Sequence, residues 1–192
     1  RERIDIKRLD KGAVIFNTER EEGFAVFVVD NTNRTEARYW IDDFLRVRQR
    51  QDNYHNTHNT LAMCKKYVTK HLSKEFEVSK ADQAELLNET MKYFQEQESF
   101  SMDDFSEKVI RQPEVVESFT RFRQEYEQDR DIRIEDEFGI SDSAVKKQAR
   151  SYKSVIKLDR NFHIYVHGNR NLLEQGEDEK GKFYKVYYEE EE

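Results

Sequence analysis

Cysteine and proline each occur once in the 192 residues, as Cys64 and Pro113. A single cysteine excludes an internal disulfide and fits a reducing compartment. No run approaches the roughly 18 apolar residues of a membrane span, and no signal-peptide pattern opens the chain. The sequence also has no stretch rich in Pro, Gly and Ser that would mark a linker. We therefore predict one domain over residues 1–192 and no membrane partner.

The motifs of common enzyme classes are missing as well. The chain has no Walker A loop, no dinucleotide-binding fingerprint, no Gly-x-Ser-x-Gly and no zinc-protease motif. The carboxylates of residues 77–137 are interspersed with Lys and Arg, which favours solvated helix faces over general acid–base chemistry. The residues favour a protein that is not an enzyme and that uses no cofactor. An uncharacterised enzyme is the weakest of the three function classes considered below.

Several side chains of the chain could in principle ligate a metal ion. His55 and His58 share a helix face, but Cys64 and His71 lie two and four turns further on, too far for one ion on a straight helix. His163 and His167 share a strand face, but no carboxylate or cysteine motif lies beside them in the sequence. The spacing favours packing or surface roles, so we predict no metal site.

The chain is acidic overall, with a net charge of −7, but its positive charges are concentrated. Residues 44–76 and residues 138–170 each carry 7 Lys and Arg against 2 Asp and Glu. Residues 77–137, between them, carry 8 against 18. We expect the two basic blocks to converge into one face, because each alone is too modest to hold duplex DNA. The alternative is that the basic and acidic blocks neutralise each other within the fold.

The second basic block begins with a glycine, a serine and a basic helix. Gly139 between Phe138 and Ile140, with an apolar residue six positions later, has the spacing of a helix-turn-helix turn. This reading predicts a positive φ at Gly139, which glycine reaches at little steric cost. It also predicts that Ser141 caps the helix that follows.

Eight cations of the two basic blocks are the candidate phosphate contacts: Arg46, Arg48, Arg50, Lys146, Lys147, Arg150, Lys153 and Lys157. The structural alternative is an ordinary capped helix with a solvated basic face. The polar residues 52–60, which include Tyr54, could add contacts to phosphates, sugars or base edges. Alternatively, they form a helix N-terminus whose Asn and Thr side chains satisfy backbone groups.

Periodicity predicts strands at both ends of the chain and helices in the middle. The expected strands are residues 4–9, 13–16 and 24–29, as an antiparallel meander, and residues 154–158, 162–166 and 183–188. The expected helices are residues 37–47 and 54–72, one from Ser79 to about Gln97, one from Ser101 and one from Pro113. The fold class is therefore α+β, with an antiparallel sheet built from both chain ends and about five helices in the middle.

Six segments spread along the chain resemble the bacterial nucleoid-associated protein family of the NdpA (YejK) type: residues 29–32 (VDNT), 39–45 (YWIDDFL), 51–55 (QDNYH), 76–82 (FEVSKAD), 144–150 (AVKKQAR) and 157–164 (KLDRNFHI). The resemblance implies a cytoplasmic bacterial protein found with the nucleoid, without catalytic activity or a known cofactor. It also implies that this chain is the C-terminal part of a longer protein, as does the absence of an initiator Met. The resemblance brings no set of binding residues with it.

Together these observations predict a non-catalytic, nucleoid-associated DNA-binding protein. Its contacts would be mainly to phosphates and therefore salt-sensitive, so RNA is a second possible ligand. The competing class is a protein-interaction or oligomerisation module, including a homo-oligomer. In that case the acidic helices form a partner surface, and DNA contacts lie in an N-terminal part outside this chain.

Overall fold

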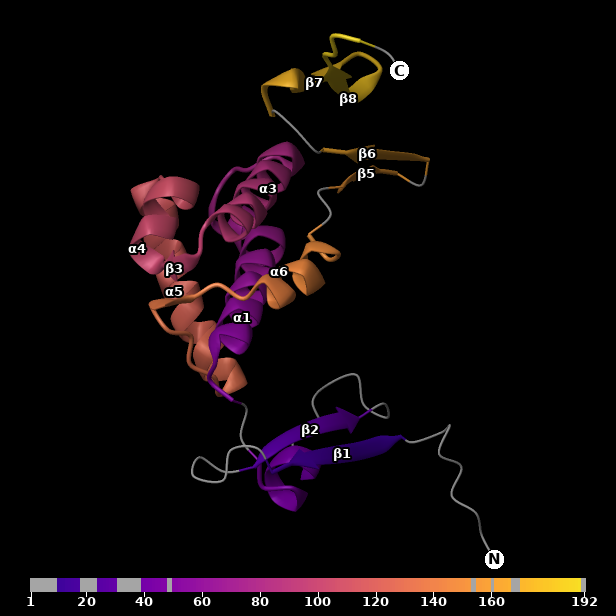
Figure 1. Ribbon diagram of the computed structural model, residues 1–192. Coiled ribbons are helices and arrows are strands. Elements are labelled where there is room, and N and C mark those ends of the chain that lie inside the picture. Colours follow the sequence, from indigo (N-terminus) through magenta and orange to yellow (C-terminus); the bar gives the residue numbers. More distant parts are fainter. Residues whose placement is uncertain are drawn as a thin grey trace, which may run out of the picture. The chain divides into compact units, whose positions relative to one another are not determined.

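A computed structural model describes residues 10–17, 24–30, 39–47, 50–152, 155–159, 161–166 and 170–190 (Figure 1). The chain divides into two compact units, Arg1–Arg50 and Gln51–Glu192. The strand expected at residues 4–9 lies outside the described residues. The single domain expected over residues 1–192 stays a prediction.

The first unit contains a β-hairpin. β1 (Lys11–Phe16) pairs antiparallel with β2 (Ala25–Asp30), and Val14 lies opposite Phe27. Both strands are rich in β-branched and aromatic residues, which suit a pleated backbone. The described part of the expected meander, its second and third strands, is confirmed.

The helix expected at residues 37–47 is a short π-helical segment, η2 (Tyr39–Phe44). The rings of Trp40 and Phe44 stack with their centroids 4.8 Å apart. The ammonium of Lys11, from β1, lies 5.8 Å from the Trp40 ring centroid. The hairpin and η2 therefore contact each other within the first unit.

The second unit is mainly helical. Its described α-helices are α1 (Asn53–Lys66), α2 (Leu72–Glu75), α3 (Lys80–Glu96), α4 (Met102–Phe105), α5 (Pro113–Arg130) and α6 (Asp142–Ala149). Two π-helical segments, η3 (Tyr67–His71) and η4 (Ser106–Ile110), continue α1 and α4 without a break. The helix expected at residues 54–72 is thus present, and helical backbone extends from α1 through η3 to the end of α2.

The predicted helix starts differ in how they are capped. Ser79 and Asp82 form a full capping box at α3, in which the Ser79 hydroxyl accepts from the Asp82 N–H and the Asp82 carboxylate accepts from the Ser79 N–H. Pro113 occupies the first turn of α5, as predicted. Ser101 and Ser141 precede α4 and α6, but neither side chain makes a capping hydrogen bond. The predicted Ser141 cap is therefore wrong, and its hydroxyl pairs with the Ser143 hydroxyl instead.

The helix-turn-helix reading of residues 138–140 is also wrong. β4 (Glu137–Gly139) pairs with β3 (Ser99–Ser101), and the rings of Phe138 and Phe100 stack across the pair at 4.8 Å. Because this pairing holds the backbone extended, the chain enters α6 from a strand and not from a preceding helix. Among the described glycines only Gly181 has a positive φ, of 119°.

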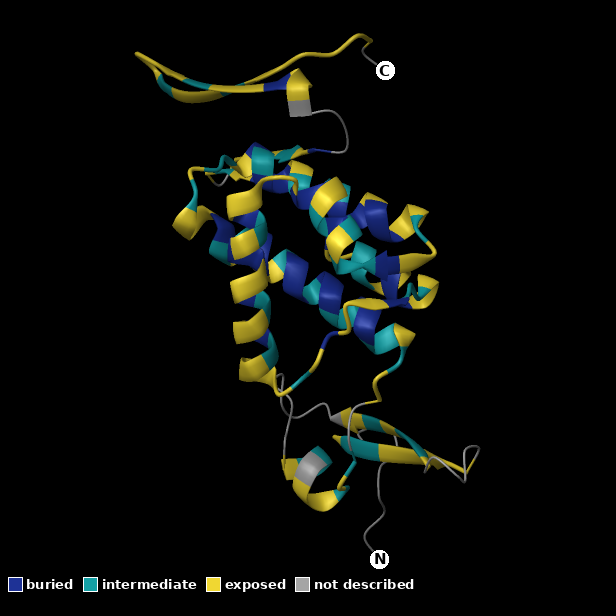
Figure 2. Cartoon of the chain, turned by 90° about the vertical axis from the view of Figure 1, so that its left-hand side faces the viewer, coloured by how far each residue is buried: buried dark blue, intermediate teal, exposed yellow. Residues whose placement is uncertain are grey.

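The core of the second unit is an aromatic-rich cluster between the helices (Figure 2). Its largest fully buried side chains include Tyr67, Phe94, Phe105, Phe119 and Tyr126. The hydroxyl groups in this core are satisfied by hydrogen bonds, because an unpaired buried donor is costly. Thus the Tyr67 hydroxyl donates to Ser118 Oγ (3.0 Å).

Two C-terminal hairpins complete the second unit. β5 (Val155–Leu158) pairs with β6 (Phe162–Tyr165), and β7 (Leu173–Asp178) pairs with β8 (Gly181–Val186). A smaller core joins them to α3, and it contains Ala81, Ala84, Ile156, Val166 and Leu173. β7 was not predicted, because its sequence LEQGED is polar and has no alternating apolar pattern.

The α+β class, with antiparallel strands near both chain ends and helices between them, is confirmed. The described strands form four two-stranded sheets, in the orders β1-β2, β3-β4, β5-β6 and β7-β8. Three of these pairs are hairpins of consecutive strands near the chain ends, and β3–β4 joins two segments of the helical part, so in the described residues the two ends do not share one sheet.

Candidate nucleic-acid interface

α6 presents its basic residues to solvent because its apolar side is buried. Ala144 and Val145 are almost fully buried in contact with the helical core, and α6 packs on α1 and α3. Lys146, Lys147 and Arg150 are exposed. Lys146 and Arg150 are separated by one helical turn, so the three cations lie close together near the C-terminal end of α6.

Within the described residues, none of these three α6 cations has a carboxylate at ion-pairing distance. Cations of the acidic block differ in this respect. Lys108 pairs with Asp104 (2.8 Å), and Arg121 pairs with both Glu117 (3.1 Å) and Glu75 (3.2 Å). These cations of the acidic block are thus paired with carboxylates, and the α6 cations stand out by contrast.

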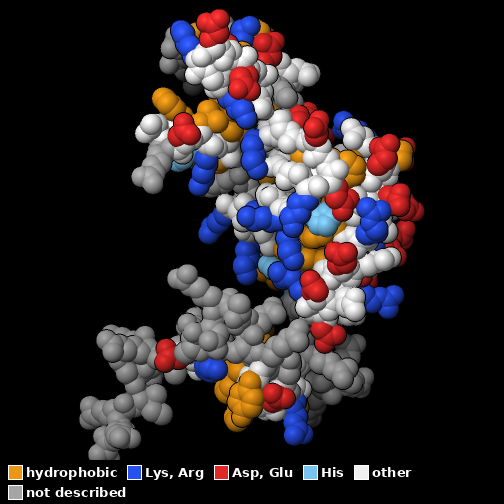
Figure 3. Space-filling model, turned by 180° about the vertical axis from the view of Figure 1, so that it is seen from behind, with side chains coloured by type: hydrophobic (Ala, Val, Ile, Leu, Met, Phe, Trp, Pro, Cys, Tyr) orange, Lys and Arg blue, Asp and Glu red, His pale blue; other side chains and the backbone are white. Residues whose placement is uncertain are grey.

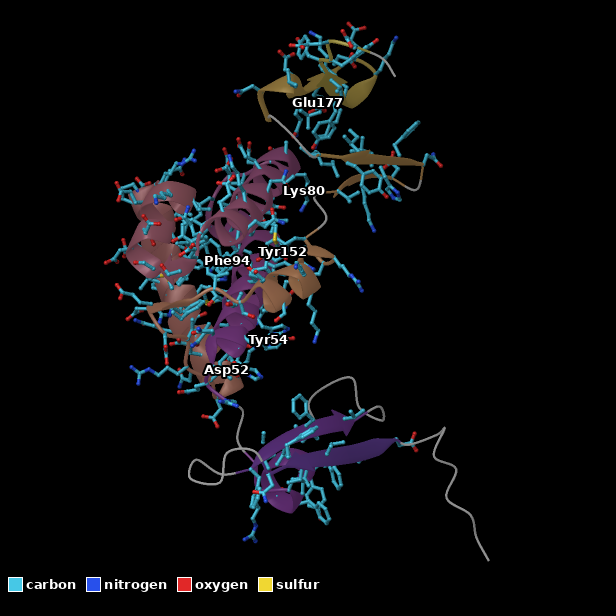
Figure 4. The ribbon with its side chains drawn as sticks, viewed as in Figure 1. Asp52, Tyr54, Lys80, Phe94, Tyr152 and Glu177 are labelled. Atoms are coloured by element: carbon cyan, nitrogen blue, oxygen red, sulfur yellow. The ribbon has the colours of Figure 1, made fainter. Side chains whose placement is uncertain are left out.

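One α6 cation contacts an aromatic side chain of α1. The Lys147 ammonium donates to the Tyr54 hydroxyl (3.3 Å) and lies 5.9 Å from the centroid of the Tyr54 ring. That ring stacks with the imidazole of His58, one turn further along α1, at 6.3 Å and an interplanar angle of 16°. Figure 4 shows Tyr54 near the N-terminal end of α1. Cations beside an aromatic surface are typical of nucleic-acid contacts.

His58 is influenced by cations from two other helices. Burial lowers the pKa of His58 most, a hydrogen bond to the Asn59 side-chain oxygen raises it, and the positive charges of Lys147, His55 and Arg130 lower it further. Lys147 belongs to α6 and Arg130 ends α5. His58 thus lies close enough to both helices to be affected by each.

A second pair of cations lies where α1 meets α5. The Arg130 guanidinium lies 4.5 Å from the centroid of the buried Tyr126 ring. The Lys66 ammonium, from α1, lies 5.3 Å from the same centroid and 5.8 Å from that of Phe122. Both charged groups are exposed, and neither has a carboxylate at ion-pairing distance among the described residues.

The polar residues 52–60 divide into two groups. Asn56, Thr57 and Thr60 are buried, and their side chains form hydrogen bonds with backbone groups. The Thr57 hydroxyl donates to the Asn53 carbonyl (2.6 Å) and accepts from the Ser141 N–H (3.0 Å). The structural reading of these amide and hydroxyl side chains is confirmed, whereas Tyr54 and His58 face the surface beside α6.

The other predicted contacts belong to other parts of the chain. Arg46 and Arg50 are exposed and belong to the first unit, while Arg48 and Lys153 lie outside the described residues. Lys157 is exposed on β5. Convergence of Arg46, Arg48 and Arg50 with the α6 cations stays a prediction.

Sequence reasoning missed two members of this surface, Lys66 and Arg130, whereas His58 belongs to the polar residues 52–60 that it did consider. Lys66 lies within the first basic block, residues 44–76, so the clustering of positive charge in the sequence indicated its region but not the residue itself. Arg130 falls inside the acidic block, and nothing in the local sequence separates it from its ion-paired neighbours. Figure 3 shows Lys and Arg side chains gathered around histidines on one face of the helical part.

The metal-ligand types found at residues 55–71 have other partners. His55 Nδ1 lies 2.8 Å from the Asp52 carboxylate, and His71 Nε2 lies 2.9 Å from that of Glu75. Cys64 is buried, which raises the pKa of its thiol and leaves it in the unreactive protonated form. No group of three metal-ligating side chains occurs in the part of the chain that the structure describes.

The fold defines an α+β protein whose helical part carries exposed cations on α1, α5 and α6, called the basic face below, together with acidic helical segments. The family model described as nucleoid-associated protein YejK matches residues 1–191, and the chain belongs to this bacterial family. No curated protein and no solved structure matches the chain. Among the described residues, no helix is both long enough and apolar enough to cross a membrane.

Proposed function

We propose that the chain binds DNA of the bacterial nucleoid in the cytoplasm, mainly through phosphates and without catalysing a reaction. The observation that carries this proposal is the exposed cation cluster of Lys146, Lys147 and Arg150 on α6, which has no ion-paired carboxylate among the described residues. Membership of a nucleoid-associated family supports the same ligand. Because phosphates are common to all sequences, we expect little sequence preference and some binding of RNA.

The net charge of −7 is compatible with this function. Exposed charges farther apart than about 8–10 Å are largely screened at physiological salt, so the local field of the basic face decides the contact. The acidic helices would repel DNA and so restrict its approach to this one face.

A salt-titrated binding assay tests the proposal. Lys146→Gln, Lys147→Gln and Arg150→Gln, combined in one variant, should weaken binding about equally for two unrelated duplexes. The slope of log affinity against log salt should become shallower by up to about 0.9 for each lost phosphate contact. Gln keeps a good helix propensity, so thermal unfolding should confirm that the variant folds.

A matched control removes three exposed, ion-paired cations of the acidic block: Lys108→Gln, Arg111→Gln and Arg121→Gln. It lowers the net charge by the same amount but should leave the salt slope near that of the parent. If the α6 variant binds like the parent at every salt concentration, or if the parent does not bind, the proposal is wrong.

The second candidate is a protein-interaction module, and one observation of the first unit favours it. Val14, Phe27 and Val29 lie on one face of the β1–β2 hairpin, and each is more than half exposed. Contiguous exposed apolar side chains typically mark an interaction site. Absence of DNA binding by the parent would leave this candidate in place.

A further inference from the structure

We infer that Lys66 and Arg130 form a second phosphate-binding subsite of the same interface, at the junction of α1 and α5. The inference rests on the proposed function, because it extends the DNA contact from the cations of α6 across α1. Its ligand class is the phosphate groups of a nucleic-acid backbone.

The first argument is the convergence of two positive charges on one ring. Lys66 and Arg130 both lie over the face of Tyr126, at 5.3 and 4.5 Å from its centroid. A ring face attracts each cation, but the two cations repel each other, and among the described residues no carboxylate pairs with either. A phosphate placed between them would relieve that repulsion and accept hydrogen bonds from both.

The second argument is the position of His58. Its pKa is lowered by burial and also by Lys147 and Arg130, so cations of α6 and of α5 act on one imidazole. Lys147 donates to Tyr54, and the Tyr54 ring stacks on His58 along the surface of α1. The α6 cluster and the Lys66–Arg130 pair are therefore parts of one continuous positive surface.

The third argument is length. His58 and Lys66 are eight residues apart on α1, which corresponds to about 12 Å along the helix. A B-DNA strand advances about 3.4 Å per nucleotide along the duplex axis. Laid parallel to the duplex axis, the positive surface is thus long enough to span about three to four nucleotide steps.

Both residues also have a purely structural explanation. Their aliphatic stems cover the Tyr126 ring, and Arg130 complements the negative C-terminal end of α5. A useful test must therefore remove the charges and keep the cover over the ring. Met at both positions does this, since its unbranched side chain packs against aromatic rings.

The experiment compares Lys66→Met/Arg130→Met with the parent on a mixed-sequence duplex across a salt series. We expect weaker binding and a salt slope shallower by up to about 0.9 per lost contact, with an unchanged thermal midpoint. The control, Lys108→Met/Arg121→Met, removes two ion-paired cations elsewhere and should bind like the parent. Lys66→Arg should restore most of the affinity that a Lys66→Met variant loses.

The outcomes separate this inference from the proposed function. If the α6 variant loses affinity while Lys66→Met/Arg130→Met keeps the parent's affinity and slope, the second subsite is refuted and the proposed function stands. If the parent does not bind the duplex, the proposed function itself fails. If both variants lose affinity and slope, both are supported.

Discussion

At the scale of single residues, neighbouring side chains of α1 have different roles: some stabilise the fold and others are available to a ligand. Thr57 and Thr60 are fully buried and hold backbone groups, whereas Tyr54 and His58 reach the surface next to α6. The sequence could not separate these roles, because both Thr and His are compatible with a polar helix start. Only the burial of one helix face decides which side chains remain available to a ligand.

The placement of His58 predicts a proton-linked affinity. Burial and the nearby Lys147, His55 and Arg130 hold the pKa of His58 below 6.5 in the free protein. Bound phosphates would neutralise these cations and raise that pKa, so binding should be accompanied by proton uptake. Affinity should therefore rise as the pH falls from about 8 to about 6, and His58→Gln should flatten this dependence.

The folded state responds to pH in the opposite direction. Because the pKa of His58 is lower in the folded than in the unfolded chain, protonation opposes folding, and stability falls as the pH drops through the unfolded value. Circular dichroism at each pH should show that the protein stays folded. If the DNA affinity of His58→Gln and of the parent depended on pH identically, His58 would not be the group that takes up the proton.

At the scale of elements, short sequence motifs that mark a helix start predicted the structure best. The capping box at Ser79 and the proline at position 113 fixed the starts of α3 and α5. The turn predicted at Gly139 failed because a tertiary contact competes with it. Gly139 is held in β4 by pairing with β3, and the apolar pair Phe100–Phe138 explains why an extended backbone replaces a turn.

The three serines that precede helices allow an internal comparison. Ser79→Ala should destabilise the protein by about 1 kcal/mol, because it removes the hydroxyl that accepts from the Asp82 N–H. Ser101→Ala and Ser141→Ala should change stability by less than about 0.5 kcal/mol, since neither side chain caps its helix. Urea unfolding measures all three. Equal losses for Ser79→Ala and Ser141→Ala would show that Ser141 does cap α6.

At the scale of the whole molecule, the division into two compact units bears on how the protein folds. Sequence composition contains no linker, which predicts one cooperative domain. The chain nevertheless divides into two compact units, and the boundary between them falls after Arg50. The candidate site could be predicted only in outline. Local sequence identifies the basic blocks, but how these blocks pack depends on contacts between segments that are distant in the sequence.

The single tryptophan makes this question measurable. Trp40 lies in η2 of the first unit, so its fluorescence reports that unit. Far-UV circular dichroism is dominated by α1, α3 and α5 of the second unit. If the chain is one domain, the two signals should give the same urea midpoint, because two-state unfolding is independent of the probe.

A core substitution in the second unit sharpens the comparison. Leu61 of α1 is fully buried, and Leu61→Ala should cost about 2–5 kcal/mol through lost apolar contacts and a residual cavity. In one cooperative domain both the circular dichroism and the Trp40 fluorescence transitions must move to lower urea together. A shift of the circular dichroism transition alone would show that the first unit unfolds independently. The α6 and Lys66–Arg130 contacts would then have to be measured in the second unit by itself.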